Sequence, residues 1–286
     1  MTPKATTPDM KAKAGAFYAL HHGPEAFIIP NPWDRGTARL LAHLGFKALA
    51  TTSMGYAFSI GQRDNTLTRE QTFANAADLA AATDLPVSAD LENGFGDSPE
   101  KVAETIRLTA ATGIVGGSIE DSSGNPDAPI YDLGLAVERI KAAVAAAKSL
   151  PYKFTLTARA ENYLHGRSDL DDTIKRLQAF EKAGADVLYA PGLRAREDIA
   201  RVVGALDRPV NAVMGLSGVQ LTLQELSAIG VKRISVGSSL CRAALGAFVR
   251  AAHEMADKGS FGYGADAASP KEMTAIFRTF ESRGDK

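Results

Sequence analysis

The chain has 286 residues, of which 45% are hydrophobic and 23% charged, and its formal net charge at pH 7 is −1. This composition is typical of a globular protein and argues against disorder or a coiled coil. The lack of a basic surplus argues against nucleic acid as a partner. The length fits two average domains or a single α/β barrel.

Cysteine content and hydropathy restrict the protein further. Cys241 is the only cysteine, so neither an intramolecular disulfide nor a cysteine-based zinc site is predicted. The N-terminal segment 1–20 has no continuous apolar core of a signal peptide. The sequence also contains no run of about 18 apolar residues, so no transmembrane helix is predicted. We expect a cytoplasmic protein without a membrane partner.

Short apolar segments rich in β-forming residues recur along the chain, and each precedes a segment with helical periodicity. The predicted strands span 26–30, 48–53, 87–92, 116–121, 154–161, 187–192, 210–215 and 233–238. The predicted helices that follow span about 34–44, 69–83, 133–148, 169–183, 195–206, 222–229 and 239–257, and a further one opens at 97–100. Thr68, with Gln71 three residues later, is typical of a capping box at a helix start.

Strict alternation of eight strands with eight helices predicts parallel strands joined by crossover helices. Eight units within about 230 residues favour a closed (β/α)8 TIM barrel over an open doubly wound sheet. No GxGxxG motif follows the first strand, so a dinucleotide-binding sheet has no support. We expect a barrel domain over residues 1–258.

A different segment follows the barrel, over residues 259–286. A glycine-rich linker precedes an amphipathic helix at about 270–282, with one apolar face that requires cover. That face carries Met273, Ile276, Phe277 and Phe280. Its partner is either the chain's own barrel or a second subunit.

Ionisable residues gather at the predicted strand ends, where barrels of this kind carry their active sites. They are Asp90 and Glu92 on the third strand, Glu120 and Asp121 on the fourth, and Arg159 and Glu161 on the fifth. Alternation along a strand places Asp90 and Glu92 on one face. Asp64 follows the second strand, Asn211 lies on the seventh, and Trp33 follows the first, where it can line a pocket.

Crowded carboxylates raise one another's pKa, and a divalent cation relieves that repulsion. A ligand set made only of oxygen atoms favours Mg²⁺, or Mn²⁺, over Zn²⁺. The alternative is a set of structural salt bridges. For Asp121 helix capping or a salt bridge is the preferred interpretation, and for Glu161 structural pairing and a role in the site both remain open.

The sequence resembles a known family, the isocitrate lyase/phosphoenolpyruvate mutase superfamily. The resemblance covers about residues 26–260 and is carried by NPWDRGTARLLAHLGFKALATTS, DLPVSADLENGFGDSPE, GGSIED, TARAE, AGADVLYAPG and VNAVMG. It implies a Mg²⁺ site for a 2-oxo acid. It also implies that the C-terminal helix is exchanged between subunits of a homo-oligomer, a dimer or a dimer-of-dimers tetramer.

The resemblance assigns roles to individual positions. Asp90 would bind the metal directly, and Glu92 and Glu120 would bind it through water. Thr52 and Ser53 would hold the substrate carboxylate, and Arg159 would face the substrate oxygens. Asp64 would either support the metal site without binding the ion directly or act as an acid–base residue beside it. Asn211 would line the pocket.

Three departures limit what the resemblance implies. Glu92 stands where the family usually has aspartate, and strand five reads ARAE in place of ARTD. More importantly, residues 122–132 (SSGNPDAPIYD) contain no Cys, Lys or His, whereas carbon–carbon lyases of the family carry a Lys-Cys-Gly-His loop there. Cys241 cannot replace that cysteine by position and is predicted to be a buried thiol.

The resulting prediction is a Mg²⁺-dependent lyase that stabilises an enolate, with Arg159 as a second positive charge. Its substrate would be a small 2-oxo or 2-hydroxy acid, cleaved at a carbon–carbon bond or decarboxylated as oxaloacetate is. Water, Tyr131 or Ser123 would supply the proton, and His165 is the one histidine placed to reach the site. The alternatives are a phosphorus–carbon bond enzyme acting on phosphonopyruvate and a barrel that only binds 2-oxo acids.

Overall fold

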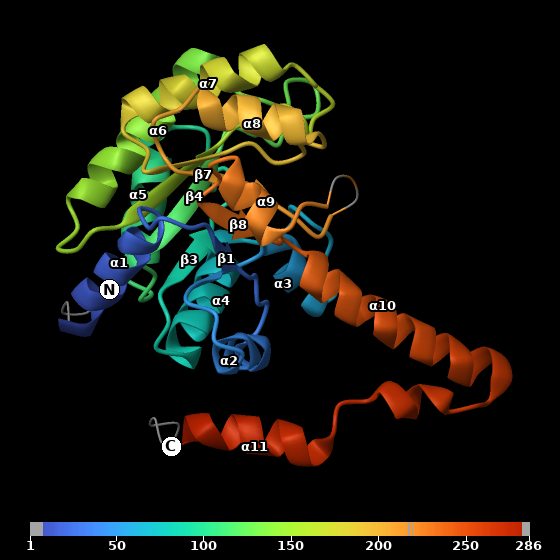
Figure 1. Ribbon diagram of the computed structural model, residues 1–286. Coiled ribbons are helices and arrows are strands. Elements are labelled where there is room, and N and C mark those ends of the chain that lie inside the picture. Colours follow the sequence, from blue (N-terminus) through green and yellow to red (C-terminus); the bar gives the residue numbers. More distant parts are fainter. Residues whose placement is uncertain (1–7, 217, 219, 282–286) are drawn as a thin grey trace.

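The computed structural model describes residues 8–281 except 217 and 219, and it contains eight parallel strands that alternate with helices (Figure 1). The strands are β1 (Phe27–Ile29), β2 (Leu49–Ala50), β3 (Val87–Asp90), β4 (Gly116–Glu120), β5 (Thr155–Arg159), β6 (Val187–Tyr189), β7 (Val210–Val213) and β8 (Arg233–Ser235). They pair in the order β1-β8-β7-β6-β5-β4-β3-β2, every pair parallel.

Asn31 closes the sheet where β1 and β2 meet. Its Nδ2 donates to Thr51 O at 2.9 Å, and its Oδ1 accepts from the backbone N–H groups of Val236 and Gly237. A backbone hydrogen bond from Ala50 N to Pro30 O, 3.1 Å long, joins the same two edges. The eight strands therefore form a nearly closed barrel, and the predicted (β/α)8 fold is confirmed.

Most helices lie where the sequence pattern predicts them. The helices up to the end of the barrel, predicted or not, are α1 (Pro8–Leu20), α2 (Arg35–His43), α3 (Ser53–Ser59), α4 (Arg69–Ala82), α5 (Pro99–Ala110), α6 (Leu133–Lys148), α7 (Leu170–Ala183), α8 (Arg196–Gly204), α9 (Leu223–Ala228) and α10 (Ser239–His253). Thr68 and Gln71 form the expected capping box at the start of α4. No helix in the described part of the chain is both long and apolar enough to cross a membrane.

Two helices were not expected from the sequence. Helix α1 closes the amino-terminal end of the barrel, where its wholly buried Phe17 packs with Ile29 and Val115. A Cβ atom on Gly116 would lie 2.7 Å from the Phe17 ring, so the glycine permits this close approach. Helix α3 interrupts the predicted strand 48–53, because Thr52 accepts a hydrogen bond from Gly55 N and caps the helix.

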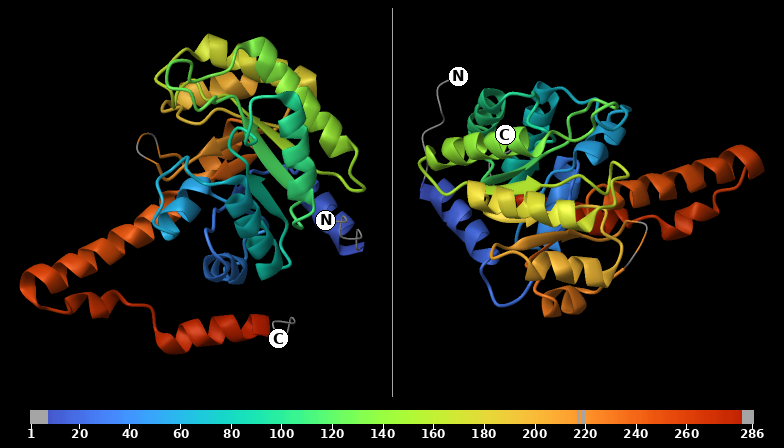
Figure 2. Two further views of the ribbon diagram at one scale, coloured as in Figure 1. Left: turned by 180° about the vertical axis from the view of Figure 1, so that it is seen from behind. Right: turned by 90° about the horizontal axis from the view of Figure 1, so that it is seen from above.

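Helix α10 extends away from the barrel, and with the chain that returns after it forms an arm (Figures 1 and 2). The arm continues through a π-helical turn η1 (Glu254–Lys258) and a 3-10 turn η2 (Gly262–Asp266) to α11 (Pro270–Glu281). The predicted helix 270–282 is therefore present, and its last residue lies outside the described residues. Ile276 and Phe280 of α11 are buried, and the Phe280 ring lies 5.5 Å from the Arg39 guanidinium of α2.

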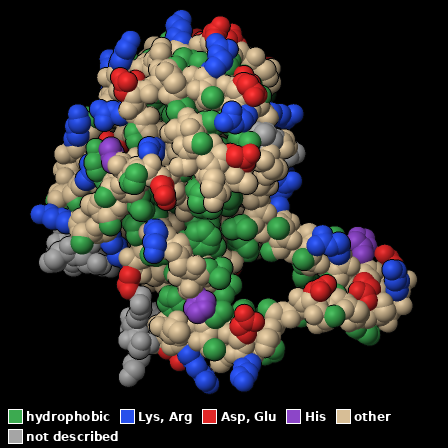
Figure 3. All heavy atoms as spheres, in the orientation of Figure 1, with side chains coloured by type: hydrophobic (Ala, Val, Ile, Leu, Met, Phe, Trp, Pro, Cys, Tyr) green, Lys and Arg blue, Asp and Glu red, His purple; other side chains and the backbone are tan. Residues whose placement is uncertain are grey.

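Helix α10 leaves much of its apolar surface uncovered, in contrast to α11. The side chains of Leu245, Phe248 and Val249 are exposed, with Phe248 at 71%. Figure 3 shows the arm separated from the barrel by an open gap. In this single chain, α11 packs its apolar face on α2 and the first turn of α10 packs on α3, but nothing in the described residues covers Leu245, Phe248 and Val249 of α10.

Candidate active site

A cavity of about 440 Å³ opens at the carboxyl ends of the strands. Most of the residues predicted to form the site line it: Thr52, Ser53, Asp64, Asp90, Glu92, Glu120 and Arg159. Trp33 and Asn211 are not among the lining residues. Trp33 is half-buried before α2, where its carbonyl accepts from Asn75, and Asn211 lies deeper, bonded to Arg233.

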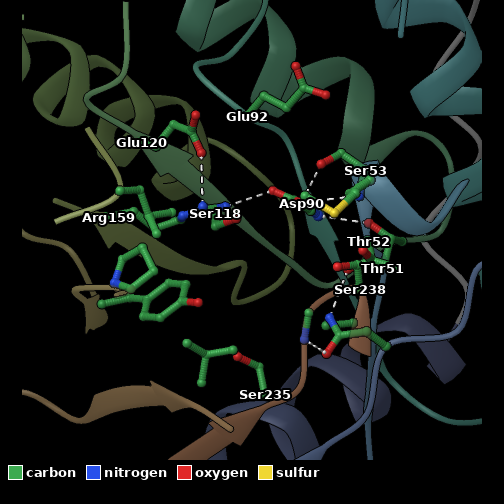
Figure 4. A pocket seen from close by; sticks show the side chains of 18 of the residues that line it. Thr51, Thr52, Ser53, Asp90, Glu92, Ser118, Glu120, Arg159, Ser235 and Ser238 are labelled. Atoms are coloured by element: carbon green, nitrogen blue, oxygen red, sulfur yellow. Dashed lines mark hydrogen bonds and ion pairs between the residues drawn. The ribbon is translucent and has the colours of Figure 1, made fainter. Parts of the chain in front are cut away.

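Arg159 is the centre of the charged cluster. Its guanidinium contacts three carboxylates: Asp90 Oδ1 at 3.0 Å, Glu120 Oε2 at 3.1 Å and Glu161 Oε1 at 3.0 Å. Figure 4 shows Asp90 and Glu120 on two sides of this guanidinium, while the carboxylate of Glu92 stands apart from both. One positive charge thus faces three negative ones, which leaves the cluster with a net negative charge.

Asp90 also connects the ends of β2 and β3. Its Oδ2 accepts from Ser53 N at 3.2 Å and from Ser53 Oγ at 2.9 Å, and its own N–H donates to Thr51 Oγ1 at 2.8 Å. These bonds fix the direction of the carboxylate, which turns its Oδ1 toward Arg159. The start of α3, absent from the predicted elements, is what brings Ser53 to this position.

Glu92 reaches the cavity differently from the way strand alternation predicts. Strand β3 ends at Asp90, and Glu92 adopts a left-handed backbone with φ of 49°. Such a conformation is uncommon for a residue other than glycine. Leu91 is fully buried, and Glu92 Oε1 is buried without a hydrogen-bond partner among the described residues. A buried carboxylate oxygen without a partner is costly unless a ligand satisfies it.

Arg139 of α6 holds the loop that carries Glu92. Its side chain donates to the carbonyl oxygens of Asn93, Gly96 and Asp97, the last two at 2.6 Å, and its guanidinium stacks 4.2 Å from the Tyr131 ring. Only 1% of Arg139 is exposed. Sequence reasoning missed this residue, although one signal was present: Arg139 falls on the apolar side of its helix, next to Ile140 and one turn from Ala136 and Ala143.

Burial and mutual repulsion raise the pKa values of the carboxyl groups. For Glu92 burial is the largest cause, Asp90 and Asp64 add to it, and the pKa rises to about 7. Burial also raises the pKa of Glu120, Glu161 and Asp64. Burial opposes the charge on Arg159, but Glu161, Glu120 and Asp90 outweigh it and hold the arginine pKa well above its usual range. The cluster therefore favours an added positive charge.

The loop after β4 contributes Ser122 to the cavity, and the loop after β5 contributes His165. His165 Nε2 lies 3.1 Å from Ser122 Oγ. Tyr131 and Ser123, the hydroxyls named from the sequence as proton donors, do not line the cavity: Tyr131 Oη donates to Asp97, and Ser123 Oγ donates to Ala128 O.

Two residues outside the cluster occupy the structural roles that the sequence indicated. Asp121 is buried and accepts from Arg176 at 3.1 Å, so its salt bridge is confirmed. Cys241 is buried and its thiol contacts Gly55 O, as expected of a structural cysteine.

The donors present fit a hard divalent cation better than a zinc ion. Carboxylate and hydroxyl oxygens surround the cavity, and oxygen ligands are those that Mg²⁺ prefers. Within residues 8–281, 217 and 219 aside, no three Asp, Glu, His or Cys side chains already converge as a metal-ligand set. Mg²⁺ usually binds one or two carboxylates and retains several waters, so such convergence is not required for it.

Comparison with known proteins identifies the relatives of the chain. The family model for phosphoenolpyruvate phosphomutase matches residues 17–256. A crystal structure from Burkholderia cenocepacia J2315, of a protein provisionally assigned as a lyase or mutase, is 61% identical, with a TM-score of 0.93 and coverage of 95% of this chain and 97% of that chain.

Two further relatives have more specific names. The 2-methylisocitrate lyase of Bacillus subtilis (strain 168) is 29% identical over 211 residues, which cover 70% of this chain and 67% of that protein. The structure of an oxaloacetate acetylhydrolase in complex with its product oxalate is 26% identical, with a TM-score of 0.84 and coverage of 93% and 94%.

Proposed function

The chain belongs to the phosphoenolpyruvate mutase family, within the isocitrate lyase/phosphoenolpyruvate mutase superfamily, and we propose that it is a Mg²⁺-dependent carbon–carbon lyase. Its substrate would be a small 2-oxo or 2-hydroxy acid, and its reaction would pass through an enolate. The observation that carries this proposal is the cluster in which Asp90, Glu120 and Glu161 share Arg159.

The proposed metal site consists of Asp90 as a direct ligand, with Glu92 and Glu120 holding the ion through water. Two observations support this site: the unpartnered Glu92 Oε1 and the raised pKa values of Glu92 and Glu120. A bound cation would give the Oε1 atom a partner and would lower both pKa values. When bound there, Mg²⁺ (or Mn²⁺) would supply Lewis-acid stabilisation of negative charge on substrate oxygens.

The chain's own residues would orient the substrate. Thr52 and Ser53 lie at the cavity wall beside Asp90, where the Thr52 hydroxyl can donate to a carboxylate. Ser53 would join it by exchanging its bonds to Asp90 Oδ2 for bonds to the substrate. The Arg159 side chain is 14% exposed and lines the cavity, so it can donate to a developing enolate oxygen. Preorganised donors of this kind are typical stabilisers of charge that develops in a transition state.

Ser122 and His165 are the proposed route for the proton. In a decarboxylation, CO2 leaves and the electron pair of the broken bond remains on the fragment that becomes the enolate. In cleavage of a 2-hydroxy acid, Asp64 would take the hydroxyl proton as the leaving fragment becomes a carbonyl compound. The enolate carbon then takes a proton from Ser122 Oγ, His165 replaces that proton across their 3.1 Å contact, and water reprotonates the imidazole. Among the described residues, His165 is the only histidine that lines the cavity.

The reaction type and the substrate can be tested together. Purified protein is assayed with a panel of 2-oxo and 2-hydroxy acids that includes oxaloacetate, with Mg²⁺ and with a chelator. We expect turnover that chelation abolishes, and His165→Gln should lower kcat at least tenfold while Mg²⁺ and oxalate still bind. His22→Gln, in the turn after α1, is the matched control. Activity that is indifferent to chelation contradicts the proposal.

A phosphorus–carbon bond reaction is the second candidate, because the matching family model is that of a phosphomutase. Phosphonopyruvate in the same panel distinguishes it: release of inorganic phosphate, or formation of phosphoenolpyruvate, favours this candidate. Ligand binding without turnover of any panel member favours a barrel that only binds 2-oxo acids.

We also propose that the protein is a homo-oligomer, a dimer or a tetramer, in which a second copy covers α10 and the C-terminal helix is exchanged. The exposed Leu245, Phe248 and Val249 support this, because contiguous exposed apolar side chains mark association surfaces. Light scattering after size exclusion should give a mass of two or four chains, and Phe248→Glu should reduce it. A monomer at micromolar concentration contradicts the proposal.

A further inference from the structure

A second buried arginine, Arg233, lines the same cavity, where its side chain joins β8 to β5. Arg233 begins β8, lines the cavity and is only 4% exposed. Unlike Arg159, it forms no ion pair with a carboxylate of the described residues. Its partners are neutral: Nε donates to Asn211 Oδ1 at 3.0 Å, and Nη1 donates to Thr157 Oγ1 at 2.9 Å.

These two hydrogen bonds hold Arg233 without satisfying it. A guanidinium carries five N–H donors in a planar fork that matches the geometry of a carboxylate. Two donors are used in the structure as described, so the fork retains donors for another acceptor. Burial lowers the pKa of Arg233 to about 10, and the group therefore remains charged at neutral pH. A buried charge without a counter-ion is costly unless an anion comes to pair with it.

The side chains around Arg233 leave room for such an anion. The cavity that Arg233 lines is walled in part by residues with small side chains: Ala50, Ser88, Ser118 and Ser235. Ser235 is itself fixed, because its Oγ accepts from Asn211 Nδ2 at 3.0 Å. Figure 4 shows Ser235 across the cavity from Glu92 and Glu120. The negative charge of Asp90 raises the pKa of Arg233, but the Asp90 carboxylate is bonded to Arg159 and Ser53 and forms no ion pair with Arg233.

We propose that Arg233, oriented by Asn211 and Thr157, forms a second anion-binding subsite that holds the distal carboxylate of the substrate. This rests on the proposed function, in which the 2-oxo acid end of the substrate lies against Asp90 and Arg159. The substrate class is thereby narrowed to short dicarboxylates, which carry one carboxylate for each end of the cavity. A monocarboxylate of the same length would leave Arg233 unpaired.

Isothermal titration calorimetry on the full-length, Mg²⁺-loaded protein tests this with a matched pair of ligands. Malate and 2-hydroxybutyrate have the same four-carbon chain and differ only in the distal carboxylate, and oxalate reports on the metal end alone. The wild-type protein should bind malate at least tenfold more tightly than 2-hydroxybutyrate. Arg233→Gln should abolish that preference and leave the oxalate affinity within about twofold.

Substitutions of two threonines in β5 test the subsite without removing the charge of Arg233. Thr157→Val removes one bond to Arg233 and should reduce the malate preference severalfold. Thr155→Val is the control, because Thr155 is equally buried and its hydroxyl has no hydrogen-bond partner among the described residues. It should leave the preference unchanged.

The outcomes separate this subsite from the proposed function. Equal wild-type affinities for malate and 2-hydroxybutyrate overturn the subsite, whether or not Arg233→Gln folds. A preference that persists in Arg233→Gln, or an equal loss of oxalate and malate, also overturns it and leaves Arg233 with a structural role. Failure of the wild-type protein to bind oxalate with Mg²⁺ overturns the proposed function, and the subsite with it.

Discussion

Two arginines lie inside the same barrel in opposite electrostatic settings. Arg159 faces three carboxylates, whereas Arg233 is held by the neutral side chains of Asn211 and Thr157. The first setting has more negative charge than its arginine can balance, so it favours a cation. The second has an unbalanced positive charge, so it favours an anion. The proposed metal site uses the first setting, and the proposed subsite for the distal carboxylate uses the second.

Removal of Arg159 should have the largest effect. Arg159→Met deprives the developing enolate of a preorganised donor, and loss of one such donor typically costs about 100- to 1,000-fold in kcat. The rate of Mg²⁺-dependent exchange of the pyruvate methyl protons in D2O, followed by NMR, is a suitable measure. Arg201→Met, in an exposed ion pair with Asp171, is the control and should change little. Undiminished exchange in Arg159→Met would remove this residue from the chemistry.

Arg139→Met should have the largest effect on stability. It removes three hydrogen bonds from a buried guanidinium to the loop that carries Glu92, which we expect to lower the free energy of unfolding by about 2–4 kcal/mol. Urea denaturation measures this loss. Mg²⁺ affinity should also fall, because the left-handed backbone of Glu92 depends on that loop. A stable variant with unchanged Mg²⁺ affinity would show that the loop keeps its conformation without Arg139.

The acidic cluster should also produce a pH-dependent stability in the metal-free protein. The pKa of Glu92 is about 7 in the folded protein and about 4.5 in the unfolded chain. The folded state then binds more protons between these values, so the free energy of unfolding falls as pH rises from about 4.5 to about 7. Glu92→Gln should flatten this slope by about 1–3 kcal/mol over the interval. The slope should not vanish, because Glu120 and Glu161 also have raised pKa values.

The smallest expected effects on stability concern Thr157 and Thr155, two threonines of β5. Thr157→Val removes a hydrogen bond to charged Arg233 and should cost about 1–2 kcal/mol of stability. Thr155→Val removes a buried hydroxyl that bonds to nothing in the described residues, so stability should be unchanged or rise by up to about 1 kcal/mol. Equal losses in thermal unfolding would mean that the bond to Arg233 contributes nothing.

The sequence predicts the barrel well because each unit repeats a local pattern, an apolar strand followed by an amphipathic helix. It predicts that Asp90, Glu120 and Arg159 lie together because the carboxyl ends of the strands meet at one end of such a barrel. It misses α3 because a short helix with a central glycine, Gly55, resembles a loop. It also misses the tasks of Arg139 and Arg233, which depend on contacts between residues far apart in the chain. Asn211, expected at the pocket wall, bonds Arg233 instead.

The most direct test of the acidic cluster as a metal site for an enolate is oxalate binding. Oxalate is a planar dianion that resembles the enolate of a 2-oxo acid and chelates divalent ions. Calorimetry should show oxalate bound to the wild-type protein with Mg²⁺, and at least about 100-fold more weakly with a chelator or in Asp90→Asn, because the ion supplies most of the attraction. Oxalate affinity that is equal with Mg²⁺, with chelator and in Asp90→Asn would contradict the account.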